Sequence, residues 1–432
     1  MRKQLRKDYS QRSANMSTCT QEAVAEENNE LRLMLFDLEW EGHHANYIRY
    51  LIRYCCEHKL PVELSIVVAS QFIEKHPDVI QAANSSSASV EFLAISEQEL
   101  QAVGNCKYAF SRSLNRLREW QLLCKYASNL NVDHCLILYL DASELPLMLG
   151  LEPPCPISGI YFRPTFHYQS FTAHAYPLEH WTKRLRERLF IHQMLHNPKL
   201  HTLFCLGPFA DEAIKELYPQ ARVISLADPV EIPQTESLNT QAMLEKQGIL
   251  LGRKVCLVFG AITVRKGIYQ LLDSLQRLPS GVCQQLSILI VGAAEPEEQS
   301  RLCAQIDLVC QALPVQVVTH FEFVSESEAQ SYFQLSDFVL AVYQRHIGMS
   351  GILLQAAAAQ KPVLSSDYGL MGELVRRYQL GISVDSSRPE AIATGITQLL
   401  SADESLCDLE KMKRFVEENS VVQFAETIFQ NV

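Results

Sequence analysis

The stretch from Asp337 to Ser366 constrains the fold most strongly, because its pattern is that of a strand, a tight loop, a helix and a second strand. Phe338 to Tyr343 is a short apolar run of strand length. Ile352 to Gln360 contains four alanines, which favour a helix. A strand and helix that alternate in this way predict a βαβ unit of an α/β protein.

The loop inside this stretch has the features of an anion site. Gly348 and Gly351 are expected to allow backbone geometry that a side chain would block. Ser350 is a favourable N-cap, so free N–H groups at the start of the helix would point above the strand end and suit an anion. Arg345 and His346 stand beside the loop. The alternative is an ordinary βαβ turn with no ligand.

Length and composition limit the classes of protein to which the chain can belong. A chain of 432 residues predicts two domains, and 47% hydrophobic with 20% charged residues is typical of a soluble globular protein. A net charge of −11 argues against non-specific nucleic-acid binding, although a local basic pocket fits it. The thirteen cysteines are scattered without a CxxC pair, which favours a reducing compartment and disfavours a zinc site. With no run of 18 apolar residues and no apolar core near the start, we expect a cytoplasmic protein.

Alternating strand and helix patterns divide the chain into two similar halves. We expect a disordered tail over residues 1–30, a Rossmann-like domain over 31–228, a second one over 229–415, and a helix over 416–432 that returns to the first domain. The boundary is placed near Asp228 and Pro229 because prolines interrupt regular structure there. The predicted strands are Leu31–Leu38, Val62–Ala69, Val90–Ile95, Cys135–Leu140, Gly159–Phe162 and Thr202–Leu206, then Val255–Phe259, Leu286–Val291, Val315–Phe321, Phe338–Tyr343 and Pro362–Ser365.

Two cations follow the first strand of the second half. Arg265 and Lys266 come just before a predicted helix, after a turn that begins at Gly260. A cation gains nothing from the dipole at a helix start, so this placement suggests that it helps to hold an anion. A solvated Lys-Gly turn is the alternative. A further glycine turn, at Gly292, follows the next strand.

With these glycine turns and this loop, the chain resembles GT-B fold glycosyltransferases of the large retaining family 4, or group 1. That family includes sucrose-phosphate synthases and bacterial polysaccharide glycosyltransferases. The resemblance extends from about Leu31 to the C-terminus, but in the first half only Gly42 matches. The matching blocks in the second half are Gly260 to Gly267, Val291-Gly292, Leu335-Ser336-Asp337 and Gly348 to Val363.

The resemblance implies an α/β protein in which two Rossmann-like domains face a central cleft (GT-B). It implies that Lys266 neutralises the diphosphate of a nucleotide-sugar donor and that N–H groups near Ser350 and Gly351 cradle it, with no cofactor and no metal. In this family retention is attributed to attack on the same face as the departing phosphate, which itself takes the acceptor proton. The donor-binding residues carried over are Gly260, Arg265, Lys266, Gly292, Arg345, His346, Gly348, Ser350, Gly351 and Gln355.

The chain departs from the family pattern at three places. Ile347 and Gln355 replace two glutamates that touch the donor sugar and the ribose, and Ala261 replaces an arginine. Ile347 cannot accept a hydrogen bond, whereas Gln355 still can. Arg345 and His346 are the candidates to compensate. A donor with a modified or less hydroxylated sugar, or loss of activity, would each fit these changes.

The first half is expected to bind the acceptor, an unidentified sugar, lipid or small molecule. Gly42, His43 and His44 follow its first strand, and Arg163 and His167 follow a later one. We assign Gly42, His44 and Arg163 to acceptor binding and His43 and His167 to catalysis, together with Lys266. Structural roles for these histidines are the alternative.

Residues 180–191 combine Trp181, Leu185 and Leu189 on one helical face with four cations elsewhere. This pattern fits weak peripheral contact with anionic lipid, and a packed helix with a solvated basic face is the alternative.

The sequence thus predicts a metal-independent, retaining glycosyltransferase that takes a sugar from a nucleotide diphosphate donor. A catalytically inactive relative that binds a sugar or nucleotide, or serves as a scaffold, is the alternative that Ile347 and Gln355 raise. A GT-B epimerase-like hydrolase is a third hypothesis, which the composition of the loop disfavours.

Overall fold

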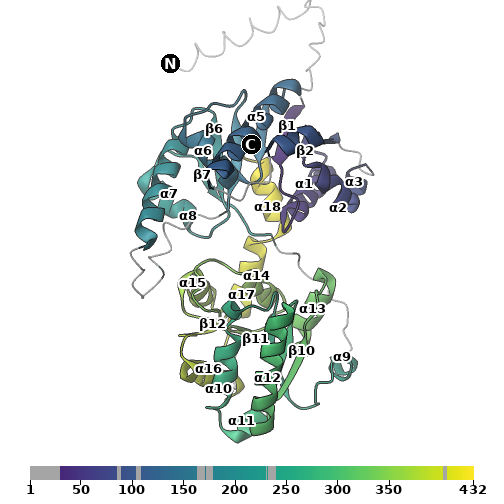
Figure 1. Ribbon diagram of the computed structural model, residues 1–432, viewed down its shortest axis with the longest axis vertical. Helices are drawn as coiled ribbons and strands as arrows, with labels where there is room; N and C mark the ends of the chain where they lie inside the picture. Colours follow the sequence, from purple (N-terminus) through teal and green to yellow (C-terminus); the bar gives the residue numbers. More distant parts are fainter. Residues whose placement is uncertain are drawn as a thin grey trace, which may run out of the picture.

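Two α/β domains stack along the long axis of the molecule (Figure 1). The computed structural model describes residues 30–84, 89–103, 109–162, 171, 179–229, 231, 240–401 and 406–432. Each domain is built on one parallel sheet with helices on both faces, which confirms the predicted pair of Rossmann-like domains. The tail expected over residues 1–30 lies outside the described residues except for Glu30.

The first domain contains a seven-stranded sheet in the order β3-β2-β1-β4-β5-β6-β7. All its paired strands are parallel, and the order reverses direction between β1 and β4. Open α/β sheets hold ligands at the carboxyl ends of the strands that flank such a switch point. The strands are β1 (Leu31–Asp37), β2 (Val62–Val68), β3 (Val90–Ala94), β4 (His134–Ile137), β5 (Ile157–Tyr161), β6 (Leu200–Cys205) and β7 (Val223–Ser225).

The second domain repeats the plan with six strands in the order β10-β9-β8-β11-β12-β13. Its strands are also parallel, and its switch point lies between β8 and β11. The strands are β8 (Lys254–Phe259), β9 (Leu286–Val291), β10 (Gln316–His320), β11 (Phe338–Ala341), β12 (Val363–Ser366) and β13 (Gly381–Val384).

Helices cover both faces of each sheet. The helices of the first domain are α1 (His44–His58), α2 (Ser70–Lys75), α3 (Pro77–Asn84), α4 (Glu97–Val103), α5 (Ala109–Asn129), α6 (Glu144–Met148), α7 (Glu179–Leu195) and α8 (Ala210–Leu217). Those that follow are α9 (Thr240–Lys246), α10 (Ile268–Leu275), α11 (Ser280–Gln284), α12 (Pro296–Ala312), α13 (Glu326–Leu335), α14 (Gly351–Ala358), α15 (Gly369–Tyr378), α16 (Pro389–Ser401), α17 (Leu409–Glu418) and α18 (Val421–Phe429).

The central strand β1 shows why the sequences of the predicted strands are continuous apolar runs. Leu33 and Leu35 pack into a cluster with α1, α2 and α3, whereas Met34 and Phe36 pack into a second cluster with α5, α7 and α8. Successive side chains of a strand point to opposite faces, so a strand buried on both faces needs apolar residues at every position. The predicted strands match the structure for this reason.

The sequence did not predict strands β7 and β13, and each lies at the edge of its sheet. The three-residue β7 falls in the segment that the prolines marked as irregular, and the four residues of β13 are all half-buried. Edge strands bury less surface and pair on one side only, so their sequences need no long apolar run.

The last helix, α18, leaves the second domain and packs on the first (Figure 1). Phe424, Ala425 and Ile428 are fully buried in the cluster that contains α1, and the Phe424 ring centroid lies 5.0 Å from that of Tyr47. Beyond the helix, the Asn431 carbonyl accepts a hydrogen bond of 2.7 Å from the Thr202 hydroxyl of β6. The chain end is therefore part of the first domain's core.

A second contact between the domains comes from Phe209, which precedes α8 with a left-handed φ of 64°. Its ring packs against the apolar cluster of the second domain, and the Arg377 guanidinium of α15 lies 3.9 Å from the ring centroid. This distance is within the range of a cation–π contact.

We expect Phe424→Ala to destabilise the protein by about 3–5 kcal/mol, since it removes a fully buried ring between α18 and α1. Val422→Ala on the same helix is the control, because Val422 is 55% exposed and its truncation should cost about 0.5 kcal/mol or less. Urea unfolding of both variants measures the difference. Equal losses would contradict the bracing role of α18.

Candidate active site

Lys266 bridges the two strands that flank the switch point of the second domain. It ends the short 3₁₀ turn η3 (Val264–Lys266), and its residue surface is 5% exposed. Its ammonium group donates to the Phe259 carbonyl at the end of β8, at 2.6 Å, and to the Tyr343 hydroxyl just beyond β11, at 2.5 Å. The ammonium also lies 4.5 Å from the centroid of the Tyr343 ring.

The surroundings of Lys266 lower the pKa of its ammonium group. Burial, with a further contribution from the charge of Arg265, lowers the pKa of Lys266 to about 7. No ion pair among the described residues includes Lys266. A buried cation with neutral partners gains much from an added anion, because charge interactions are strong away from water.

Glycines let the backbone segments around Lys266 approach closely, but at other positions than expected. Gly267 has a φ of 73°, and a Cβ there would lie 2.1 Å from the Val342 carbonyl oxygen. A Cβ on Gly292 would lie 2.3 Å from the Gly260 carbonyl oxygen. A side chain at Gly348 or Gly351 would not be blocked by the protein, so that expectation is wrong. A Cβ on Gly348 would lie 3.9 Å from the His346 ring, and a Cβ on Gly351 would have no described atom within 4 Å.

The loop before α14 is bonded to Arg265 through His346. The Nη1 of Arg265 donates to His346 Nδ1 at 3.2 Å, and His346 Nε2 donates to the Met349 carbonyl at 3.1 Å. These bonds fit a neutral imidazole, and burial lowers the pKa of His346 below its usual value. Arg345 is exposed with a left-handed φ of 50°.

Ser350 holds the N-cap position of α14, but its hydroxyl donates to the Tyr343 hydroxyl, at 3.3 Å. Within the described residues it makes no side-chain cap bond to the helix, which leaves the first N–H groups of α14 for another acceptor. Ile347 packs against the apolar cluster of this domain, and Gln355 is half-buried on α14.

In the first domain, a histidine and an aspartate form a close pair beyond β1. Asp37 is 2% exposed, and His44 Nδ1 lies 2.6 Å from its Oδ2. The other oxygen of Asp37 accepts from the Glu39 backbone N–H at 3.0 Å. The imidazole stacks on Phe162, with centroids 5.9 Å apart, and meets the edge of Tyr139 at 5.7 Å.

This pairing fixes the tautomer of His44. Burial acts to lower the pKa of His44, but the hydrogen bond and charge of Asp37 outweigh it and hold the pKa above its usual value. Burial likewise raises the pKa of Asp37. With Nδ1 bonded to the carboxyl group, Nε2 is the nitrogen that can exchange a proton with a ligand. An acidic residue at the end of a buried strand is the signal by which Asp37 could have been found.

Of the other residues assigned to acceptor binding and catalysis in this domain, two are described by the structure. Gly42 and His43 are exposed, and the His43 ring stacks on Tyr47 with centroids 6.3 Å apart. The Tyr47 hydroxyl donates to Asp228 at 3.2 Å, which places His43 beside the segment that leads to the second domain. Arg163 and His167 lie outside the described residues.

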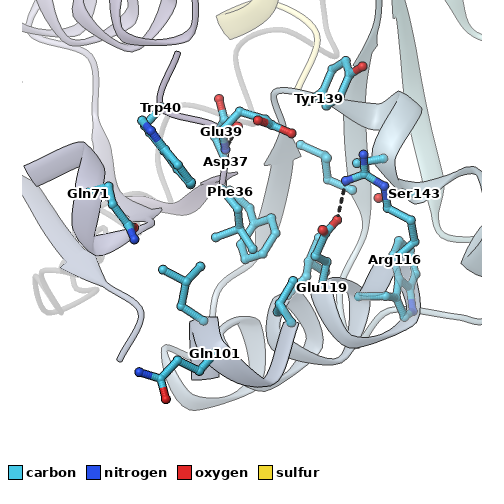
Figure 2. A pocket seen from close by; sticks show the side chains of 17 residues that line it. Phe36, Asp37, Glu39, Trp40, Gln71, Gln101, Arg116, Glu119, Tyr139 and Ser143 are labelled. Atoms are coloured by element: carbon cyan, nitrogen blue, oxygen red, sulfur yellow. Dashed lines mark hydrogen bonds and ion pairs between the residues drawn. The ribbon is translucent and has the colours of Figure 1, made fainter. Parts of the chain in front are cut away.

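A cavity of about 490 Å³ opens beside Asp37, at the switch point of the first sheet (Figure 2). Its polar groups include Glu39, Gln71 and the ion pair of Arg116 with Glu119. Apolar and aromatic side chains make up most of the rest of its wall. The lining residues are Phe36, Asp37, Leu38, Glu39, Trp40, Gln71, Leu100, Gln101, Val103, Arg116, Glu119, Trp120, Leu123, Ile137, Tyr139, Ala142 and Ser143.

The geometry agrees with the family comparison. Residues 239–419 match the family model described as "Glycosyl transferases group 1". This match covers the sheet and the loops around Lys266, so the second domain is similar to group 1 glycosyltransferases, and the two-domain fold is GT-B. No curated protein matches the sequence of the chain.

Solved glycosyltransferase structures share the whole two-domain fold. A glycosyltransferase from Rickettsia africae is 14% identical with a TM-score of 0.63, over 93% of this chain and 97% of that one. The Anabaena protein HepE in complex with UDP is 14% identical with a TM-score of 0.63, over 93% and 98%. Sucrose-phosphate synthase from Thermosynechococcus elongatus is 13% identical with a TM-score of 0.64, over 93% and 98%.

We expect Asp37→Asn to lower the pKa of His44, because the substitution removes the charge that offsets burial of the imidazole. A proton NMR titration measures the pKa, with the His44 signal assigned by its loss in His44→Gln. Glu41→Gln is the control, because it removes the charge of an exposed carboxylate on the same loop and should leave the pKa of His44 unchanged. An unchanged pKa in Asp37→Asn would show that the two side chains are not coupled.

Proposed function

We propose that the protein is a metal-independent, retaining glycosyltransferase that moves a sugar from a nucleotide diphosphate donor to an acceptor bound by the first domain. The observation that carries the proposal is Lys266, a buried cation without a described counter-ion at the switch point of a domain that is similar to group 1 glycosyltransferases. HepE, which shares the fold, is described in complex with UDP-glucose.

The donor diphosphate would be held by cations and by helix N–H groups together. Lys266 and the N-cap residue Ser350 of α14 both donate to the Tyr343 hydroxyl, and Arg265 donates to His346 in the loop before this helix. The first N–H groups of α14 lack a side-chain cap from Ser350. When the bond to the sugar breaks, negative charge develops on the phosphate oxygen. Fixed donors that already point at this oxygen stabilise it without reorganisation, which is the role that a metal ion serves in other transferases.

The sugar itself would meet an unusual surface. Ile347 offers no hydrogen-bond acceptor through its side chain, and Gln355 offers a neutral amide where the resembling family has carboxylates. These residues fit a donor sugar with fewer hydroxyl groups than glucose. They also motivate the second candidate, a non-catalytic protein that binds a nucleotide sugar, which a donor-hydrolysis screen with several nucleotide sugars separates from an enzyme.

Retention is the finer part of the proposal. In a retaining reaction the departing phosphate takes the acceptor proton, and the Asp37–His44 pair would only orient the acceptor. In an inverting reaction a base must take that proton, and His44 Nε2 is a candidate among the described residues. Proton NMR of the first product decides between them through its anomeric configuration.

We expect Lys266→Ala to weaken binding of UDP by about 1.5–3 kcal/mol, or roughly 10- to 150-fold, because it removes a charge-assisted hydrogen bond to the diphosphate. Isothermal titration calorimetry measures the affinity. Lys254→Ala is the control, since Lys254 is an exposed lysine at the opposite end of β8. If neither UDP nor another nucleoside diphosphate binds the unmodified protein, the proposed function is wrong.

The pH dependence of UDP binding follows from the pKa of Lys266. Because this pKa is about 7 in the free protein, the charged form that an anion prefers is lost as the pH rises through 7. Binding above pH 7 must therefore take up a proton, so affinity should fall between pH 7 and 9, and Lys266→Ala should flatten the fall. Calorimetry in buffers with different ionisation enthalpies measures the proton uptake. A pH-independent affinity in the unmodified protein would contradict the assignment.

We also propose weak peripheral contact between α7 and anionic lipid. Leu185 and Leu189 are 47% and 50% exposed on this helix, beside the exposed Arg186 and Arg188. Among the described helices, none is long and apolar enough to cross a bilayer. The eleven described cysteines are all free thiols, which fits a cytoplasmic location.

Sedimentation with phosphatidylserine vesicles tests this contact, and Leu185→Ser/Leu189→Ser should reduce the bound fraction by about half or more at low salt. Leu250→Ser/Leu251→Ser is the control, because these leucines are also exposed but lie in the second domain. No binding of the unmodified protein at low or physiological salt would remove the idea.

A further inference from the structure

The cavity of the first domain lies where an acceptor would be expected, and its lining restricts what that acceptor can be. Asp37 and Leu38 follow β1 and Tyr139 follows β4, so the cavity occupies the switch point of the first sheet. Asp37 of the Asp37–His44 pair lines the cavity, and so does Tyr139, whose ring makes a T-shaped contact with the imidazole. Figure 2 shows the side chains of Trp40, Phe36 and Glu119 around one space.

Carboxylates outnumber cations in this lining. Asp37, Glu39 and Glu119 face the cavity, against the single guanidinium of Arg116. Arg116 already pairs with Glu119, with 2.7 Å between nitrogen and oxygen. The charge of Glu39 acts on both members of this pair, which shows that the carboxylate lies near them. An anionic ligand would therefore meet repulsion, and it would have to displace Glu119 to reach Arg116.

The remaining charge near the cavity does not reverse this balance. The Lys75 ammonium lies 5.6 Å from the centroid of the Trp40 ring, but it also lies 3.7 Å from Glu41 and is not part of the lining. His44 is bonded to Asp37, so its proton offsets a carboxylate of the cavity and adds no excess positive charge.

The apolar part of the lining suits a ring. Phe36 and Trp40 line the cavity, as does Trp120. Aromatic side chains bind the flat apolar face of a ring, while the amides of Gln71 and Gln101 and the carboxylate of Glu39 offer hydrogen bonds to hydroxyl or amino groups. A cavity of about 490 Å³ has room for two such rings.

We propose that this cavity selects an acceptor that is uncharged or cationic, carries hydroxyl groups and has an apolar ring face, and that it rejects phosphorylated and carboxylated acceptors. The inference rests on the proposed function, because only a transferase needs an acceptor. It adds to that function the chemical class of the second substrate.

Intrinsic fluorescence gives a direct test, because Trp40 and Trp120 line the cavity and the chain has three tryptophans. Trp181→Phe leaves only the two cavity indoles. In this background we would titrate phenyl β-D-glucoside, glucosamine and glucose 6-phosphate at constant ionic strength. We expect saturable changes with the first two and a dissociation constant for glucose 6-phosphate that is at least about tenfold higher, a difference of ~1.4 kcal/mol.

A variant that removes two carboxylates from the cavity tests the role of charge directly. Glu39→Gln/Glu119→Gln leaves Arg116 without its carboxylate partner, so glucose 6-phosphate should bind about tenfold more tightly while phenyl β-D-glucoside changes less. Glu57→Gln/Glu63→Gln is the control, since it removes the same charge from two exposed positions of this domain outside the cavity lining. Glu39→Gln alone, at an exposed residue, gives a milder variant should the double one fail to fold.

The outcomes separate this inference from the function on which it rests. Equal or tighter binding of glucose 6-phosphate by the Trp181→Phe protein would overturn the inference, and so would the absence of any response to phenyl β-D-glucoside. UDP binding by the same samples, measured by calorimetry, reports on the second domain alone. Intact UDP binding together with either result would leave the transferase assignment standing and remove only the acceptor class.

Discussion

The hydrogen bonds of the Lys266 ammonium to the Phe259 carbonyl and the Tyr343 hydroxyl determine how the second domain can bind a ligand. They tie the ends of β8 and β11 together at the switch point, where the strand order reverses direction. Burying an ammonium among neutral groups opposes folding, because the charge loses its water. From about pH 7 to the ordinary lysine pKa of 10.5, the folded protein has released a proton that the unfolded chain retains, so this penalty declines as the pH rises. An anion offsets the same penalty by direct attraction.

The first domain also has charged groups at the switch point of its sheet, but most of them are carboxylates. Both faces of each sheet are covered by helices, which leaves the carboxyl ends of the strands as the place where polar groups can reach a ligand. At β1 and β4 this place holds Asp37 and His44 and a lining rich in carboxylates. At β8 and β11 it holds Lys266, with Arg265 and His346 beside it. One switch point is thus suited to an anion and the other to a neutral or cationic molecule, which is the pairing that transfer from a diphosphate donor to an uncharged acceptor needs.

The sequence was sufficient for the central strands and for the position of Lys266 in the turn after β8, and insufficient for the contacts between distant segments. Central strands are buried on both faces and so show in the sequence as unbroken apolar runs, whereas the edge strands β7 and β13 do not. The partner of Lys266 at Tyr343 lies 77 positions away, and no local pattern indicates it. Similarly, His43 and His44 are equivalent by spacing, and only the position of Asp37 at the end of β1 distinguishes His44.

Because the two charged sites belong to different domains, the contacts that join the domains bear directly on the reaction. Phe424 of α18 ties the C-terminal segment to the first domain, while Phe209 reaches the other way, into the apolar cluster beneath Arg377. Tyr47 connects these contacts to chemistry, because its ring packs on Phe424 and its hydroxyl donates to Asp228 in the segment between the domains. Tyr47 thus links the segment between the domains to α1, the helix that begins at His44. Under the proposed function, closure over a bound donor would reach the acceptor side through these contacts of α1.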